Sequence, residues 1–140
     1  LIEAEAAVRG WITADAETLY KDGIRASLAQ YGVVGEFDAY YSVAEVTFTG
    51  TDEEKIAKIG MQRWLANFMQ DGVEAWSDWR RLNVPDIKPG PSASISHIPY
   101  RRVYYPDDYS TNMNNYNEAI KQQGADNFDT RLWWDVSDND

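Results

Sequence analysis

The sequence predicts a mainly α-helical fold, made of helical hairpins and long ordered loops that wrap the helical body. Two regions, 1–32 and 51–85, carry apolar residues at spacings of three and four, which is the period of an amphipathic helix. The region 86–140 is instead rich in Pro, Gly, Ser and Asn, but it also holds many aromatic rings. Because long loops stay ordered only when they are anchored, we expect these rings to hold the loops against the helices.

Composition favours a folded protein and excludes several functions. The chain has 140 residues, a length sufficient for one domain with a hydrophobic core. Its aromatic content of 14% argues against disorder. Its net charge of −10 would repel nucleic acid, so no nucleic-acid partner is expected. The sequence contains no cysteine, which excludes disulfides and thiolate metal sites, and no apolar run long enough for a transmembrane helix.

Residues 1–32 are predicted to form a helical hairpin. The first helix contains several alanines that permit close packing, and it ends at Gly10. The second helix begins at a capping residue, either Thr13 or Asp15, and ends at Gly32. Two helices joined by a short turn in this way are typical of tetratricopeptide-like repeats.

Residues 51–85 are predicted to form a central pair of helices. The first helix starts with a capping box, in which Thr51 and Glu54 satisfy each other's backbone amides. Gly60 interrupts the apolar stripe of this helix at a cost of about 1 kcal/mol, so we expect another helix or a large ring to approach it closely. The second helix is expected to end where Asn83 adopts a left-handed conformation.

The end of this second helix carries Trp76 and Trp79 beside Arg80 and Arg81. We expect the guanidinium planes to stack on indole rings and to fork onto carboxylates. Aromatic residues at helical spacing usually form core, so the cluster is interpreted as structural.

The segment 33–50 allows two interpretations. It could form a short helix over 36–45, or a strand over 43–49, which its β-branched residues favour. Tyr40 and Tyr41 lie in this ambiguous part and are the candidate ligand-binding residues, because exposed rings can stack on a sugar face. The alternative is that both rings fill hydrophobic space and have their hydroxyls satisfied locally.

In the region 86–140, the sequence predicts wrapping loops and one short helix over 115–123, which ends at Gly124. Trp133 and Trp134 show no helical or strand period, and they are expected to plug into the helical body. The last four residues are expected to fray.

No catalytic arrangement is evident in the sequence. His97 is the single histidine, and a triad would require an activated Ser94 or Ser96, which nothing in the sequence signals. The acidic end of the chain, from Asp135 to Asp140, lacks the central glycine and the distant glutamate of a calcium loop. The chain is therefore expected to be no enzyme and to hold no metal and no cofactor.

Short motifs spread over nearly all 140 residues occur in a characteristic order. They are Glu3-Ala4-Glu5-Ala6, Leu19-Tyr20, Gln62-x-Trp64, Gly72-x-Glu74-Ala75-Trp76, Trp79-Arg80-Arg81, Ile98-Pro99-Tyr100-Arg101-Arg102, Tyr105-Pro106 and Thr130-Arg131-Leu132-Trp133-Trp134-Asp135. This order resembles the C-terminal part of the SusD/RagB family of outer-membrane glycan-binding lipoproteins. The chain departs from the family at Asn83, where glycine is usual, and Asn tolerates the same left-handed turn.

The resemblance implies that residues 1–140 are the C-terminal part of a single SusD-like domain. It implies a parent lipoprotein on the outer face of a Bacteroidetes-type outer membrane, attached through a lipidated N-terminus absent from this chain. That parent would capture an oligosaccharide or polysaccharide and act with a TonB-dependent, SusC-like transporter. The resemblance carries no specific glycan-binding residue over to this chain. Two alternatives stay open. One is a purely structural scaffold, which supports a site built by the absent portion or serves a ligand other than a glycan, and the other is a glycoside hydrolase.

Overall fold

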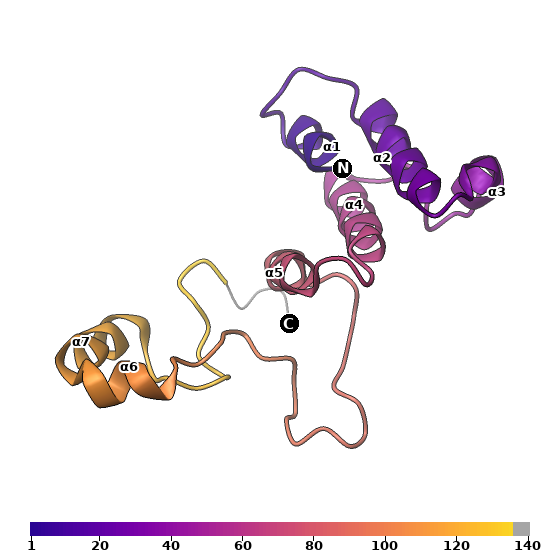
Figure 1. Cartoon of the computed structure of the whole chain (residues 1–140). Helices are drawn as coiled ribbons and strands as arrows, with labels where there is room; N and C mark the ends of the chain where they lie inside the picture. The colour runs from indigo at the N-terminus through magenta and orange to yellow at the C-terminus, as the bar shows by residue number, and fades with distance from the viewer. Residues whose placement is uncertain (136–140) are drawn as a thin grey trace. The chain divides into compact units, whose positions relative to one another are not determined.

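The computed structural model describes residues 1–135. The described chain divides after Pro85 into two compact units, residues 1–85 and residues 86–135. The boundary coincides with the change of composition after Pro85. The described residues contain helices and no strand, which confirms the mainly α class. In chain order the helices are α1 (Ile2–Val8), α2 (Ala16–Gln30), the 3₁₀ turn η1 (Val34–Glu36), α3 (Phe37–Tyr41), α4 (Asp52–Ala66), α5 (Gly72–Leu82), α6 (Pro106–Thr111) and α7 (Met113–Gln123) (Figure 1).

The predicted hairpin is present as α1 and α2, which pack against each other. Asp15, rather than Thr13, caps α2, because its carboxylate accepts a hydrogen bond from the backbone N–H of Thr18 at 3.0 Å. Gly10 and Gly32 follow the two helices with φ of +72° each, as expected for residues that end helices in the left-handed region.

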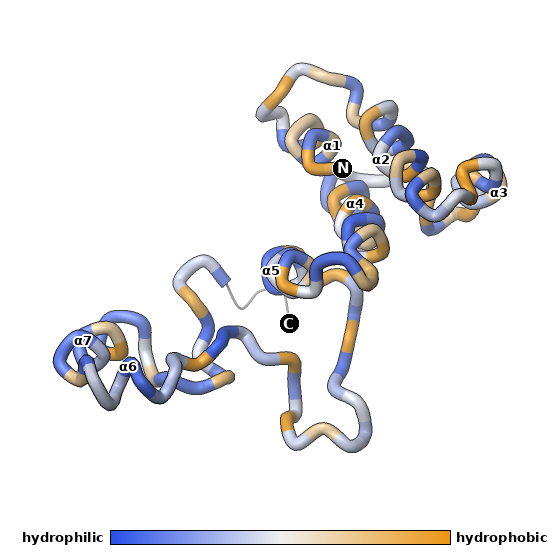
Figure 2. Tube along the Cα trace, in the orientation of Figure 1, coloured by the Kyte–Doolittle hydropathy of each residue, from blue (hydrophilic) through white to orange (hydrophobic). Residues whose placement is uncertain are grey.

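The core of the first unit lies where α1, α2, α3 and α4 meet. The buried residues are Ala4, Tyr20, Ile24, Phe37, Val46 and Ile59. Tyr20 is fully buried, and its hydroxyl donates to the carbonyl of Val46 at 2.9 Å, so its polar end is satisfied. In Figure 2 hydrophobic and hydrophilic residues alternate along α2 and α4, as expected for helices with one buried face.

The segment after α2 is η1, α3 and a series of turns, so the predicted strand over 43–49 is wrong. The helical alternative is correct only for the five residues of α3. The β-branched residues bond locally: the amides of Val46 and Thr47 both donate to the carbonyl of Val43 at 2.9 Å. A strand needs a partner strand, and the part of the chain that the structure describes offers none.

The central pair α4 and α5 begins and ends as predicted. The amide of Thr51 donates to Glu54 at 2.7 Å and the amide of Glu54 donates to Thr51 at 3.3 Å, which completes the capping box. Asn83 ends α5 with φ of +53°. A Cβ at Gly60 would lie 2.9 Å from Cδ1 of Leu82, which confirms that α5 approaches this glycine closely. Phe68 lies beyond the end of α4 at Ala66 and is 60% exposed.

The second unit contains the predicted helix as α7, which ends at Gly124 with φ of +89°. It also contains α6, whose residues were predicted to be part of a loop. The signals for α6 were present, since Pro106 occupies the first helical position and Asp107 and Asp108 complement the helix dipole.

The two tryptophans of the tail differ in exposure, and their contact with the helical body stays a prediction. Trp133 is 91% exposed. Trp134 is 36% exposed. The expected fraying of the last four residues, and all of the rejected calcium-loop segment except Asp135, lie outside the described residues. Within residues 1–135, no helix has both the length and the apolar character needed to span a membrane.

Two helical glycines are expected to respond differently to alanine. A Cβ at Gly23 would lie 2.6 Å from Cγ of Leu1 and 3.1 Å from its backbone nitrogen, so Gly23→Ala should lose roughly 1–2 kcal/mol of stability despite better helix propensity. At Gly60 the contact below 3.0 Å is with the flexible tip of Leu82, and Val84 lies at an ordinary 3.7 Å, so we expect Gly60→Ala to keep stability within about 0.5 kcal/mol of wild type or higher. Urea unfolding of both variants tests this, and equal effects would contradict it.

Candidate functional site

The two tyrosines predicted as a sugar platform point their hydroxyls into the protein. Tyr40 donates to the side-chain oxygen of Gln62 at 2.9 Å. Tyr41 donates to Glu17 at 2.9 Å and accepts from the backbone N–H of Phe48 at 3.2 Å. Both side chains are half-buried against the core. These contacts match the alternative interpretation, in which both rings fill hydrophobic space and have their hydroxyls satisfied locally. The role of Tyr40 and Tyr41 as a surface on which a sugar stacks stays a prediction.

The ring of Tyr41 also has close neighbours. Phe37 stacks on it with centroids 5.5 Å apart and planes inclined by 16°. The ammonium of Lys21 lies 4.8 Å from the ring centroid. Aromatic stacking and a nearby cation together restrict the space that a sugar ring would need.

The main electrostatic feature of the first unit is the carboxylate of Glu5 on α1, which is only 5% exposed. Arg81 on α5 forks onto it: Nη2 lies 2.8 Å from Oε2, and Nη1 bonds Oε1. Arg9 donates to Oε1 at 2.8 Å. Arg63 on α4 reaches Oε2 at 3.4 Å. One acid on α1 thus joins three helices. Its two hydrogen bonds from Arg81 confirm the prediction that an arginine at the end of α5 binds both oxygens of a carboxylate.

A second buried acid completes the network. Asp78, which is 8% exposed, pairs with Arg63 at 2.7 Å and with Arg81 at 3.0 Å. Glu5 and Asp78 therefore share two guanidinium groups, and the network of three arginines and two acids ties α1, α4 and α5 together. The arginine pair was evident in the sequence, but its partner 76 residues away was not.

The network controls the ionisation of Glu5. Burial alone would raise the pKa of this carboxyl, but hydrogen bonds from Arg81 and Arg9, with their positive charges, lower its pKa to about 2. The same hydrogen bond raises the pKa of Arg81 against the effect of its own burial. Glu5 therefore stays ionised in the folded protein down to strongly acidic pH.

The other residues of the predicted tryptophan and arginine cluster are structural as well. The guanidinium of Arg80 lies 3.8 Å from the ring centroid of Trp76, which confirms the predicted stacking. Trp79 is buried, and its indole N–H donates to the carbonyl of Pro85 at 3.1 Å. This bond fastens the residues after α5 back onto the helix.

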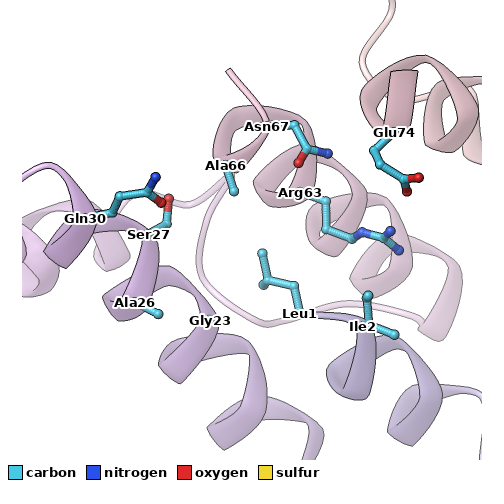
Figure 3. A pocket seen from close by; sticks show the side chains of 10 residues that line it. All are labelled: Leu1, Ile2, Gly23, Ala26, Ser27, Gln30, Arg63, Ala66, Asn67 and Glu74. Atoms are coloured by element: carbon cyan, nitrogen blue, oxygen red, sulfur yellow. The ribbon is translucent and has the colours of Figure 1, made fainter. Parts of the chain in front are cut away.

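A cavity of about 500 Å³ opens between the start of α1 and the helices α2, α4 and α5 (Figure 3). The side chain of Leu1 points into it, and Arg63 and Glu74 lie on the side away from α2 (Figure 3). Its lining consists of Leu1, Ile2, Gly23, Ala26, Ser27, Gln30, Arg63, Ala66, Asn67 and Glu74. None of these residues is aromatic, so the cavity lacks the stacking surface that sugar sites commonly use.

His97 has the neighbours that a triad would require, but in the wrong setting. Ser96 lies 3.2 Å from Nδ1 of His97, and Asp129 lies 3.2 Å from Nε2. Ser96 directly precedes His97 in the chain, and the carboxylate of Asp129 is 72% exposed. A catalytic base needs a buried acid to orient it, and this solvated acid does not meet that need.

The described residues contain no group of three or more His, Cys, Asp or Glu side chains that could hold a metal ion. Among the described residues, the first unit thus offers a charged network and a cavity without rings in its lining, and the second unit offers a cluster of tyrosines.

Comparison with known proteins identifies the family. A family model described as "Starch-binding associating with outer membrane" matches residues 1–106. The chain belongs to the SusD-like family. No curated protein sequence matches this SusD-like chain.

Solved structures agree with the family model. A Bacteroidetes SusD-like protein is 31% identical with a TM-score of 0.84, and the match covers 96% of this chain and 28% of that one. A SusD homologue from Bacteroides fragilis is 32% identical with a TM-score of 0.83, over 97% and 33% of the two chains. A chitin-binding SusD homologue from Flavobacterium johnsoniae is 29% identical with a TM-score of 0.78, over 98% and 35%.

The SusD-like chain therefore spans about a third of the length of these relatives. The family description and the name of the Flavobacterium johnsoniae neighbour refer to binding, which agrees with the prediction that the chain is not an enzyme. The description also associates the family with the outer membrane.

Acid is expected to destabilise this SusD-like chain through Glu5. Because the pKa of Glu5 falls from about 4.5 to about 2 on folding, its ionised form contributes about 3 kcal/mol above pH 4.5, and this contribution disappears as pH falls toward 2. Urea unfolding between pH 6 and 3 should therefore show a smaller slope of stability against pH in Glu5→Gln than in wild type. Parallel slopes would show that Glu5 does not carry the effect.

The forked geometry of Arg81 is expected to matter more than its charge. Its side chain is 37% exposed while Glu5 is buried, so Arg81→Ala should lose about 2–3 kcal/mol, less than for a fully buried pair. Arg81→Lys keeps the charge but cannot bond both oxygens, and it should recover less than half of that loss. A lysine variant as stable as wild type, measured by urea unfolding, would contradict this expectation.

Proposed function

We propose that this chain is the C-terminal part of a longer SusD-like lipoprotein that captures an oligosaccharide or polysaccharide at the outer face of the outer membrane. The observation that carries the proposal is the family match over residues 1–106, with chitin-binding neighbours in the same fold. A lipidated N-terminus outside this chain would attach the protein to the membrane.

Partnership with a TonB-dependent, SusC-like transporter belongs to the same proposal. A binding protein without catalysis raises the local concentration of a glycan, and uptake then requires a channel beside it. The chain suits a binding role, because 14% of its residues are aromatic and rigid rings stack on sugar faces at low entropic cost.

A second candidate is that the first unit acts as scaffold for a site built by the rest of the protein. The internal hydroxyl contacts of Tyr40 and Tyr41 favour it. The absence of rings from the lining of the 500 Å³ cavity favours it as well.

Affinity electrophoresis separates these candidates. This chain, and a longer protein that contains it, are run through gels containing soluble starch, glycol chitin or another soluble polysaccharide. Retardation of the longer protein on at least one glycan is expected. Retardation of the chain itself would place a site within the 140 residues. If neither is retarded on any glycan, the proposed function is contradicted.

The platform role of Tyr40 and Tyr41 has its own test. Tyr41→Ala removes hydrogen bonds to Glu17 and Phe48 as well as a stacked ring, so we expect a loss of stability of about 2–4 kcal/mol. Urea unfolding followed by circular dichroism measures this loss. Unchanged stability together with lost retardation on a glycan gel would instead establish the platform.

A further inference from the structure

The second unit contains a smaller cavity of about 230 Å³ beside α6 and α7, and its lining differs in kind from that of the first unit. The lining residues are Tyr104, Asp108, Asn112, Asn115, Tyr116 and Ala119. Two aromatic rings, two amides and one carboxylate thus face one hollow. This combination of apolar walls and a few polar groups is typical of sites for small polar ligands.

The two rings form a corner. The centroids of Tyr104 and Tyr116 are 5.8 Å apart and the rings are inclined by 78°. Tyr109 packs against Tyr116 with a centroid distance of 5.7 Å. Both lining tyrosines are half-buried, so each keeps part of its ring accessible. Such a corner offers apolar contact to the C–H groups of a sugar from two directions.

A single acid holds the corner in place. Asp126 accepts a hydrogen bond from the backbone N–H of Tyr104 at 3.1 Å and from the hydroxyl of Tyr116 at 3.3 Å. Arg101, which is 5% exposed, lies 3.6 Å from the same carboxylate and balances its charge. The rings are therefore positioned before any ligand arrives, which lowers the entropic cost of binding.

The polar groups of the cavity have unused hydrogen-bonding capacity. Asp108 accepts from the backbone N–H of Tyr105 through Oδ2 at 3.1 Å, and its Oδ1 bonds no other described residue. Asn115 donates to the side-chain oxygen of Asn112 at 2.7 Å. Both residues are exposed, and this bond uses neither the amide nitrogen of Asn112 nor the amide oxygen of Asn115. Donors and acceptors placed side by side match the vicinal hydroxyls of a sugar.

We propose that this cavity binds a single neutral sugar residue of a glycan. Its volume lies below the roughly 300–1,000 Å³ of sites for larger ligands, which restricts it to one ring at a chain end or branch. The lining contains a carboxylate and no cation, which disfavours uronic acids and sulfated sugars. The inference rests on the proposed glycan-binding function and assigns a place for it in this chain.

The test compares two double variants of the full 140-residue chain. Asn112→Ala with Asn115→Ala removes both amides that bond each other, so neither is left with a lost partner, and folding should be retained. Asn114→Ala with Asn117→Ala changes two exposed amides of α7 outside the lining and is the matched control. Circular dichroism checks that both variants keep the helical content of wild type.

The probes are soluble starch and glycol chitin as neutral glycans and alginate as an anionic one, in affinity electrophoresis. We expect wild type and control to be retarded by a neutral glycan, and the lining variant to bind roughly tenfold more weakly or worse, as for two lost hydrogen bonds. Equal retardation of all three proteins would overturn the site and leave the proposed function intact.

The other outcomes are also decisive. If the control variant binds the neutral glycan as weakly as the lining variant, the loss reflects a general effect on α7, and the proposed site is overturned. Retardation by alginate alone would overturn the choice of a neutral sugar. If wild type is retarded by no glycan while the longer protein is, this site fails and glycan capture remains elsewhere in the protein. If the longer protein is not retarded by any glycan either, the proposed glycan-binding function is contradicted, and with it the site that rests on it.

Discussion

The first unit depends on one buried negative charge. The carboxylate of Glu5 has lost nearly all contact with water, and such a group is tolerated only when cations and hydrogen bonds replace its solvation. Arg9 supplies these from its own helix, and Arg63 and Arg81 supply them from α4 and α5. Because an uncompensated charge at this position is costly, any movement that separates these helices is opposed. The network thus fixes the mutual positions of α1, α4 and α5, while the apolar core around Tyr20 and Ile59 joins them to α2 and α3.

This division of roles explains why the rings that pack around the core and at the end of α5 are poor candidates for ligand contact. Tyr20, Tyr40 and Tyr41 all use their hydroxyls inside the protein, and Trp79 uses its N–H to fasten the chain beyond α5. These internal contacts give the first unit the character of a framework, in keeping with the scaffold candidate. In the second unit, Asp126 accepts hydrogen bonds from the backbone N–H of Tyr104 and the hydroxyl of Tyr116, and parts of both rings remain accessible beside two amides that bond each other. The same residue type serves packing in one unit and is available for binding in the other.

Local chemistry was sufficient to predict most element boundaries. The capping box at Thr51, the left-handed Asn83, and the glycines after α1, α2 and α7 each depend on bonds or torsions within a few residues, so the sequence pattern contains the whole cause. Prediction failed where the outcome depends on distant partners. Val43 to Thr49 have strand propensity, but a strand without a neighbour leaves its backbone groups unpaired, and turns satisfied them instead. Helix α6 was not predicted for a similar reason. A helix of six residues obtains little stability from helix propensity alone, and packing on α7 stabilises it further.

The sequence by itself determined the helical class, the positions of the caps, the family and the expectation that Arg80 and Arg81 stack and fork. It could not name the acid that Arg81 meets, because Glu5 is 76 residues away and any of 23 acids was eligible. It also could not tell whether Tyr40 and Tyr41 face solvent or the core, since a ring at an ambiguous position suits both. Only the tertiary structure decided these points, because burial and charge compensation are properties of the assembled helices. The hollow beside α7 is a further case, since its rings and amides come from separate turns of chain that only folding brings together.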